Sequence, residues 1–194
     1  MKVAVFGKPG GGKSTLSLEI AKATGLPLHQ LDLIQFAEGG TRVPDDLFLK
    51  RHAEILSGEQ WVVDGFGTPQ AFSNLLSAAD VLVYIERRSI VLYWWVTKRL
   101  VKSPFSRPLG WPKGSPVIRS TVDSYRFLRL SHRFWTPAFR EKLLALGDGK
   151  RVFVVTRQSD ARAVIAELQS RSTRSEAWPA KHESVHVNSR PRHP

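Results

Sequence analysis

The amino-acid sequence predicts an α/β fold with a five-stranded parallel sheet and helices on both faces. The strands are predicted from five short apolar runs rich in β-favouring residues, at 2–6, 26–33, 61–64, 81–85 and 151–155. Segments with helical spacing of apolar residues separate these runs, and strands that alternate with helices are typical of a parallel sheet. The chain has 194 residues, 42% of them hydrophobic, which is enough for one domain of this kind.

The helices are predicted from apolar periodicity and from residues that begin or end helices. Pro44, Asp45 and Asp46 favour a helix start, and Gly58 favours the end of a helix over 44–57. Further helices are expected over 68–78, 89–101, 117–134, 137–147 and 160–168. The stretch 103–116 is rich in proline, glycine and serine and is therefore predicted to be a loop.

The first predicted strand leads into Gly7-Lys8-Pro9-Gly10-Gly11-Gly12-Lys13-Ser14, and a helix is expected to begin at Thr15. This segment fits G-x-x-x-x-G-K-[ST], the pattern of the phosphate-binding P-loop. Glycines let consecutive backbone N–H groups surround an anion at the positive end of the helix. The pattern predicts that Lys13 reaches the β- and γ-phosphates and that Ser14 ligates Mg²⁺. We expect ATP and Mg²⁺ on residues Gly7, Lys8, Pro9, Gly10, Gly11, Gly12, Lys13, Ser14 and Thr15.

The net charge of +12 is concentrated in one internal block. Residues 1–86 hold 7 basic and 10 acidic residues, whereas residues 87–142 hold 13 basic residues against Asp123 and Glu141. After residue 170, serine, arginine, histidine and proline dominate the sequence. We therefore expect a folded domain over 1–170 and a disordered basic tail over 171–194.

Several absences set expectations about location and partners. The chain has no cysteine, so disulfides are excluded, and no signal peptide precedes the first predicted strand. The longest apolar run, 90–96, is too short to span a bilayer. We expect a soluble, cytoplasmic protein without membrane insertion, either a monomer or a dimer.

Three sequence motifs together resemble the adenylate-kinase-like P-loop proteins, closest to those labelled topology-modulation (FlaR-like) proteins. They are the early P-loop, His29-Gln30-Leu31-Asp32, and Trp61-Val62-Val63-Asp64-Gly65-Phe66, followed by a late basic helical segment. The resemblance covers about residues 1–170. It implies a P-loop NTPase fold of the nucleoside-monophosphate-kinase type, the use of ATP and Mg²⁺, and kinase activity on an acceptor that is poorly defined.

The sequence departs from adenylate kinases at two places. Those enzymes continue Asp-Gly-Phe with Pro-Arg, but here Gly67-Thr68-Pro69 follows, so the arginine is missing. This difference argues against AMP as the acceptor. Glu86, after the fourth predicted strand, stands where aspartate is common in relatives.

Two carboxylates are expected at the carboxyl edge of the sheet, where ligands of such folds bind. Asp64 ends the third predicted strand and is expected to hold Mg²⁺ or its waters; the alternative is a turn residue that caps the following loop. Asp32, in the second predicted strand, is expected to accept the proton of an acceptor hydroxyl or to bind the acceptor, and its alternative role is a helix N-cap. Gln35 and Arg42 are near in sequence and are further candidates for holding the acceptor.

The basic block suggests a lid that closes over phosphates. Arg99 lies 13 residues after Glu86, where relatives commonly have an arginine. Arg119, Arg126 and Arg133 repeat every seven residues with Arg129 beside them, so a helix would align them in one cationic stripe. A lid over 103–133 would let Arg99 and Arg126 meet the charge on the transferred phosphoryl group. The alternative is a solvated arginine face.

The aromatic run Tyr93-Trp94-Trp95 is predicted to belong to a helix of the core or of a dimer contact, with one ring near the core. Aromatic residues among cations also suit single-stranded nucleic acid or a membrane interface, and these alternatives stay open.

These features predict an ATP- and Mg²⁺-dependent phosphotransferase that moves the γ-phosphate to a small acceptor, a nucleotide or nucleoside. The catalytic candidates are Lys13, Asp32, Asp64, Arg99 and Arg126, and the metal ligands are Ser14 and Asp64. One alternative is a P-loop NTPase without an acceptor. The other is an ATP-switched nucleic-acid-binding protein that uses the basic block 87–142.

Overall fold

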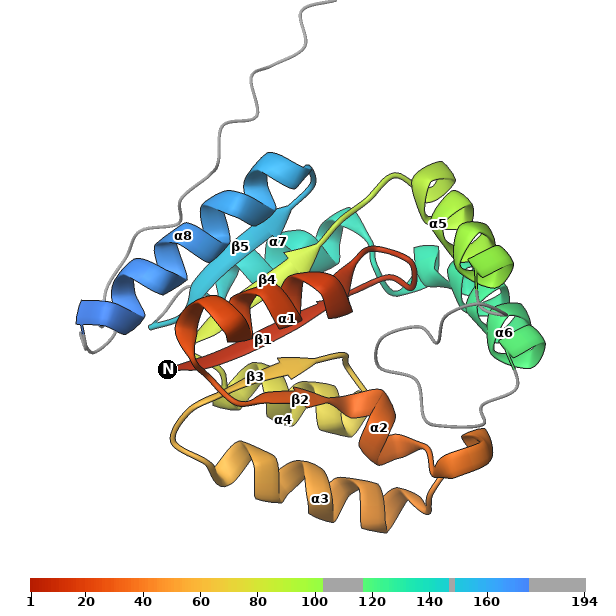
Figure 1. The fold of residues 1–194 in the computed structure, drawn as a ribbon, viewed down its shortest axis with the longest axis horizontal. Coiled ribbons are helices and arrows are strands. Elements are labelled where there is room, and N and C mark those ends of the chain that lie inside the picture. Colours follow the sequence, from red (N-terminus) through yellow and green to blue (C-terminus); the bar gives the residue numbers. More distant parts are fainter. Residues whose placement is uncertain (103–116, 147–148, 175–194) are drawn as a thin grey trace, which may run out of the picture.

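The computed structural model describes residues 1–102, 117–146 and 149–174. At its centre lies a five-stranded, wholly parallel sheet in the order β2-β3-β1-β4-β5 (Figure 1). The strands are β1 (Lys2–Gly7), β2 (Leu28–Gln30), β3 (Trp61–Asp64), β4 (Val81–Ile85) and β5 (Arg151–Val155). The predicted α/β fold with a five-stranded parallel sheet is therefore confirmed.

Helices cover both faces of the sheet because successive strand residues point to opposite sides. Val3 and Val5 of β1 contribute to the core on one face, under α1 (Lys13–Thr24) and α8 (Gln158–Arg174). Ala4 and Phe6 contribute to the core on the other face. That face is covered by α3 (Asp45–Ser57), α4 (Pro69–Ala78) and α7 (Pro137–Ala145). Burial on both faces explains why the strands read as continuous apolar runs rather than as alternating ones.

The remaining helical elements lie near the P-loop end of the molecule. They are α2 (Leu31–Gln35), the short helix η1 (Glu38–Gly40), α5 (Ser89–Lys102), α6 (Val117–Leu130) and the short helix η2 (Ser131–Arg133). Helices α5 and α6 lie side by side at one end of the molecule (Figure 1). None of the helices in the described ranges is long and apolar enough to cross a membrane.

The second strand is shorter than predicted, and this changes the position of Asp32. The strand ends at Gln30, whose register partner, Asp64, is the last residue of β3. With no strand left to pair with, the chain turns into α2, where the Leu31 side chain is fully buried beside Gly65. Asp32 therefore lies in the first turn of a short helix, and the prediction that it ends a strand is wrong.

The closing helix is longer than predicted. It was expected over 160–168, but α8 runs from Gln158 to Arg174 and enters the range assigned to the tail. Within that range the Ser172 hydroxyl donates a hydrogen bond to the Thr24 carbonyl, at 2.8 Å. Arg171 lies 3.7 Å from Glu167 one helical turn earlier. Residues 175–194, the rest of the predicted tail, lie outside the described residues.

Candidate functional site

Two glycines of the P-loop are required by close approach of backbone to backbone. Gly7 ends β1 opposite Ile85 with φ of +147°, and a Cβ there would lie 2.4 Å from the Ile85 carbonyl oxygen. Gly10 has φ of +74°, and its Cβ would lie 2.9 Å from the Leu92 carbonyl oxygen of α5. A side chain at either position would push the loop away from β4 or α5, so glycine fixes the shape of the loop here.

The start of α1 is free of side chains that would compete with an anion. Gly12, the residue before the helix, has φ of +89°, and a Cβ there would meet no atom within 4 Å. The helix has no side-chain cap and no acidic residue in its first turn. The first N–H groups of a helix have no intrahelical partner, and they form its positive end. This open backbone cradle therefore fits a phosphate group.

Lys13 lies along the same loop. Its Nζ atom donates a hydrogen bond to the Lys8 carbonyl oxygen at 3.1 Å, which keeps the ammonium group beside the backbone that forms the cradle. Ser14 follows in the first turn of α1 and is partly buried. The structure therefore brings together the two side chains that the motif assigns to phosphate and metal.

Asp64 lies next to the P-loop in the sheet and is only 5% exposed. It pairs in register with Val5 of β1, two residues before the loop begins. Its Oδ2 atom lies 3.5 Å from the Gln30 amide nitrogen, but its Oδ1 atom is buried and has no hydrogen-bond partner among the described residues. A buried carboxylate oxygen without a partner is costly. Asp64 therefore fits a Mg²⁺ ion or a water bound to one.

The described residues contain no cluster of three or more histidine, cysteine, aspartate or glutamate side chains that could hold a metal ion. This suits Mg²⁺, which is commonly held by one or two carboxylates together with phosphate oxygens and water.

Aromatic packing holds the loop after Asp64 in place. The Phe66 ring lies 5.3 Å from that of Phe127 in α6 and 5.9 Å from that of Trp135. Gly67 has φ of +65°, and a Cβ there would lie only 2.7 Å from the Phe48 ring of α3. The loop is thus tied to both α3 and α6.

Sequence reasoning missed Gln30, Phe66 and Phe127 as parts of this site. Gln30 would have been found only from the register of β2 against β3. The two phenylalanines meet across a long separation in sequence, which no local pattern indicates.

The predicted acceptor residues Asp32, Gln35 and Arg42 lie on one folded segment. An antiparallel bridge between Phe36 and Arg42 closes it, and the Ala37 N–H donates a hydrogen bond to the Thr41 carbonyl at 2.8 Å. Gln35 is buried, whereas Asp32 is exposed.

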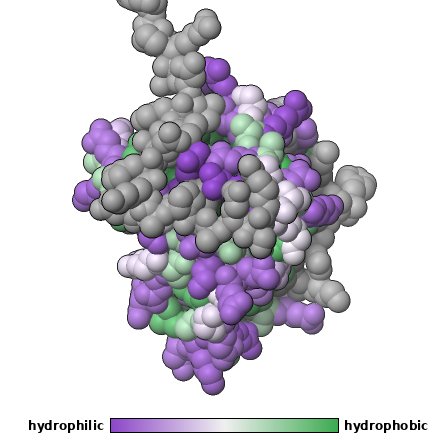
Figure 2. Space-filling model, turned by 90° about the vertical axis from the view of Figure 1, so that its left-hand side faces the viewer, coloured by the Kyte–Doolittle hydropathy of each residue, from purple (hydrophilic) through white to green (hydrophobic). Residues whose placement is uncertain are grey.

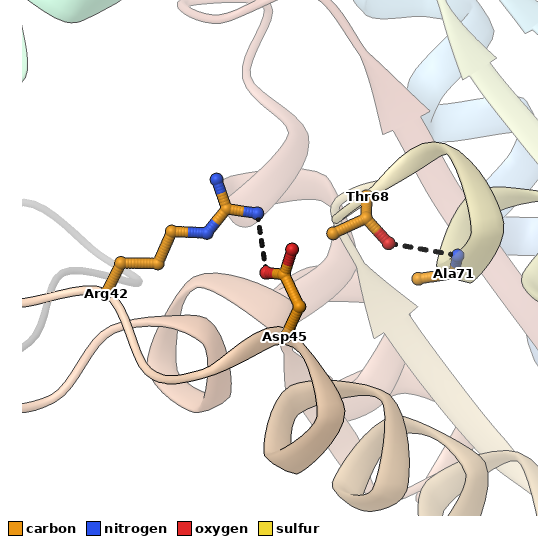
Figure 3. A network of polar contacts seen from close by, with 4 residues as sticks. All are labelled: Arg42, Asp45, Thr68 and Ala71. Carbon is orange, nitrogen blue, oxygen red and sulfur yellow. Dashed lines mark hydrogen bonds and ion pairs between the residues drawn. The ribbon is translucent and has the colours of Figure 1, made fainter.

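Polar contacts fix the far end of that segment and the start of the neighbouring helix. Arg42 is exposed, and its guanidinium donates to Asp45 at the start of α3, at 2.9 Å (Figure 3). The Thr68 hydroxyl caps α4 by accepting the Ala71 N–H, at 3.2 Å (Figure 3). Arg42 therefore already has a carboxylate partner where an acceptor was expected.

The arginines of the predicted lid are only partly within the described residues. Arg126 is paired with Asp123 at 3.6 Å, and three quarters of its side chain (75%) is exposed. Arg129 and Arg133 are exposed as well. The side chains of Arg99 and Arg119, and the predicted loop 103–116, lie outside the described residues.

Glu86 contacts α7. Its Oε2 atom lies 3.7 Å from Nε of Arg140. Burial and the negative charge of Glu86 raise the pKa of Tyr84 to about 12, although Arg140 opposes the shift. Tyr84 therefore stays protonated at neutral pH and is not a candidate for a general base.

Comparison with known proteins supports the fold. No protein-family model and no curated protein matches the chain by sequence. Among solved structures, a shikimate kinase from Acinetobacter baumannii, in complex with shikimate, has a TM-score of 0.52 and 17% identity, over 90% of this chain and 93% of that one. A putative kinase from Chloroflexus aurantiacus has a TM-score of 0.51 and 17% identity, over 87% and 96%. At this identity the similarity shows the shared fold alone. The resemblance to adenylate-kinase-like and topology-modulation proteins is not confirmed by it.

Proposed function

We propose that the protein is a Mg²⁺-dependent phosphotransferase that moves the γ-phosphate of ATP to a hydroxyl group of a small acceptor. The observation that carries this proposal is Asp64, a buried carboxylate with one oxygen unpartnered among the described residues, on the strand beside β1. The P-loop continues from β1 at the same edge of the sheet. Two proteins of similar fold are a shikimate kinase and a putative kinase, which agrees with this class of reaction.

The chain's own groups would bind and orient the nucleotide. Backbone N–H groups of the P-loop and of the first turn of α1 would hold phosphate oxygens, and Lys13 would exchange its contact with the Lys8 carbonyl for the β- and γ-phosphates. Ser14 and Asp64 would hold Mg²⁺, which supplies positive charge beside the phosphate oxygens. Phosphoryl transfer depends mostly on such positioning and charge neutralisation.

The acceptor would bind beside α2. Asp32 is exposed one turn beyond Gln30, which itself contacts Asp64, so Asp32 is our candidate for holding or deprotonating the acceptor hydroxyl. Nucleosides and nucleotides are the first acceptor class that we propose. Small hydroxylated acids are the second, because one protein of similar fold was solved with shikimate.

The arginines would act on the charge of the transferred group. Arg126 would have to leave Asp123 to reach a phosphate, and the exposed i,i+3 contact between them is weak enough to allow this. Arg99 is the second candidate for this role.

Incubation with γ-labelled ATP and a panel of nucleosides, nucleotides, sugars and hydroxy acids tests the proposal. We expect label in one acceptor class and ADP formation that depends on that acceptor. ADP formation that no acceptor increases would support a simple NTPase instead.

The Asp64→Asn variant tests the site itself. It should lower turnover by about 100-fold, the scale expected for lost electrostatic stabilisation in a preorganised site. A matched control is Asp80→Asn, because Asp80 accepts the Lys2 backbone N–H at 2.8 Å at the opposite edge of the sheet. The control should lose stability rather than turnover per folded molecule. Normal turnover in a folded Asp64→Asn protein would reject the proposed role of Asp64.

A further inference from the structure

Helix α5 has an exposed apolar stripe. Ile90, Trp94 and Val101 are 73%, 65% and 67% exposed. Their separations of four and seven residues place them on one side of the helix. Leu92 and Val96, which are fully buried, lie on the other side. This overturns the expectation that one ring of Tyr93-Trp94-Trp95 lies near the core, because all three are exposed.

The stripe is turned away from the P-loop. A Cβ at Gly10 would lie 2.9 Å from the Leu92 carbonyl oxygen and 3.0 Å from a methyl carbon of Val96, so the buried side of α5 packs on the loop. The proposed phosphoryl transfer therefore makes no use of Ile90, Trp94 or Val101.

Helix α6 extends this surface. The rings of Tyr93 and Tyr125 stack with their centroids 5.8 Å apart, and the hydroxyl groups of Tyr125 and Thr97 are hydrogen-bonded. Val122 and Arg129, three residues before and four after Tyr125, share its side of α6 and are exposed. We call the surface formed by Ile90, Trp94, Val101, Val122 and Arg129 the outer face.

The surroundings of the outer face are cationic. Exposed basic residues of the described chain from 88 to 133 are Arg88, Lys98, Arg126, Arg129 and Arg133. The acidic residue in the described part of this range is Asp123, and Arg126 contacts it. A second copy of the chain would bring like charges together, so charge complementarity favours an anionic partner.

We propose that the outer face binds the surface of an anionic phospholipid membrane. An apolar stripe with a tryptophan, flanked by cations, is the pattern by which helices lie in a membrane interface. Single-stranded nucleic acid fits less well, because it needs exposed rings on which bases stack. Three of the apolar residues here are aliphatic, and the Lys98 ammonium lies over the neighbouring Trp95 ring at 5.0 Å.

Co-sedimentation of the full chain with phosphatidylcholine vesicles, with and without phosphatidylglycerol, tests the proposal. We expect binding only to the vesicles that contain phosphatidylglycerol, and binding should weaken as salt rises. Trp94→Ser and Arg129→Glu should each weaken it by about tenfold, from the lost apolar contact and the reversed charge.

Matched controls lie on α3, away from the outer face. Leu47→Ser removes an apolar side chain that is 36% exposed, and Arg51→Glu reverses an exposed charge. Both should bind vesicles like the wild type. Trp94→Ser should keep its melting temperature and any acceptor-dependent ADP formation, so failure of this proposal is distinct from failure of the proposed function.

Three outcomes would overturn the proposal. The first is equal sedimentation with both kinds of vesicle or with neither. The second is tight, salt-sensitive binding of a single-stranded oligonucleotide that Trp94→Ser abolishes while vesicle binding persists. The third is a dimer in analytical ultracentrifugation that dissociates in Trp94→Ser, which would assign the face to a second copy.

Discussion

The P-loop edge of the sheet and the outer face of α5 and α6 lie on opposite sides of the same helix and are built differently. At the P-loop edge, backbone meets backbone so closely that Gly7 and Gly10 have no room for a Cβ. At the outer face, Ile90 and Trp94 keep most of their surface in solvent. The side of the molecule away from α5 and α6 presents mainly hydrophilic side chains (Figure 2). The contrast suggests that steric constraint fixes the first region, whereas a partner would complete the second.

Lys13→Ala should have the largest effect on the P-loop side. Removing the cation that the motif aims at the phosphates should lower turnover by about 1,000-fold, as for a lost charge contact in a preorganised site. The melting temperature should change little. Lys22→Ala, in the last turn of the same helix, is the matched control and should be near normal. Phosphoryl transfer assays and thermal melts measure both, and near-normal transfer by Lys13→Ala would reject the kinase assignment.

Gly7→Ala should have the largest effect on stability. Its Cβ would lie 2.4 Å from a carbonyl oxygen at a φ of +147°, so we expect a loss of about 3 kcal/mol in the free energy of unfolding. Gly25→Ala is the matched control. That glycine also has positive φ (+74°), but nothing lies within 4 Å of its Cβ position, so only conformational strain of about 1 kcal/mol applies. Urea denaturation that gives equal losses would contradict the steric argument.

The same contrast explains what the sequence could predict. The P-loop was recognisable because its glycines and Lys13 are set by local backbone geometry over eight consecutive residues. The position of Asp32 was mispredicted because the end of β2 depends on where its neighbour β3 stops. The contact between Gln30 and Asp64 follows from strand register, and the exposure of Trp94 follows from how α5 packs, so neither is present in a local pattern.

The hairpin arginines test whether the cationic side also serves catalysis. Arg126→Ala and Arg99→Ala should lower turnover by about 10- to 100-fold while the Kd for ATP changes little, because the charge they meet develops in the transition state. Loss of the exposed contact with Asp123 should cost less than about 0.5 kcal/mol in stability. Arg162→Ala, an exposed position on α8, is the control. Unchanged turnover in both variants would remove the lid role and leave these residues to surface binding.

The smallest effect that we expect is a pH dependence of stability from His52 in α3. This side chain is 1% exposed, and neither ring nitrogen has a hydrogen-bond partner among the described residues. Burial lowers the pKa of His52 below its ordinary value of 6.5, so the unfolded chain binds more protons than the folded one below that pH. The contribution of His52 to the free energy of unfolding is therefore highest above pH 6.5 and falls as the pH drops below it, with a slope of at most about 1.4 kcal/mol per pH unit.

His52→Leu should flatten this slope in urea titrations between neutral and mildly acidic pH. Burial lowers the pKa of His29 as well, so part of the slope should remain in the single variant and disappear only when His29 is also replaced. The His52 ring packs against Phe48, at 5.9 Å, and Phe48 in turn leaves no room for a Cβ at Gly67. Acid should therefore loosen the loop after Asp64 before it affects the outer face. Hydrogen exchange that opens α5 and α6 first, or an unchanged slope in His52→Leu, would show that the pH-sensitive contact lies elsewhere.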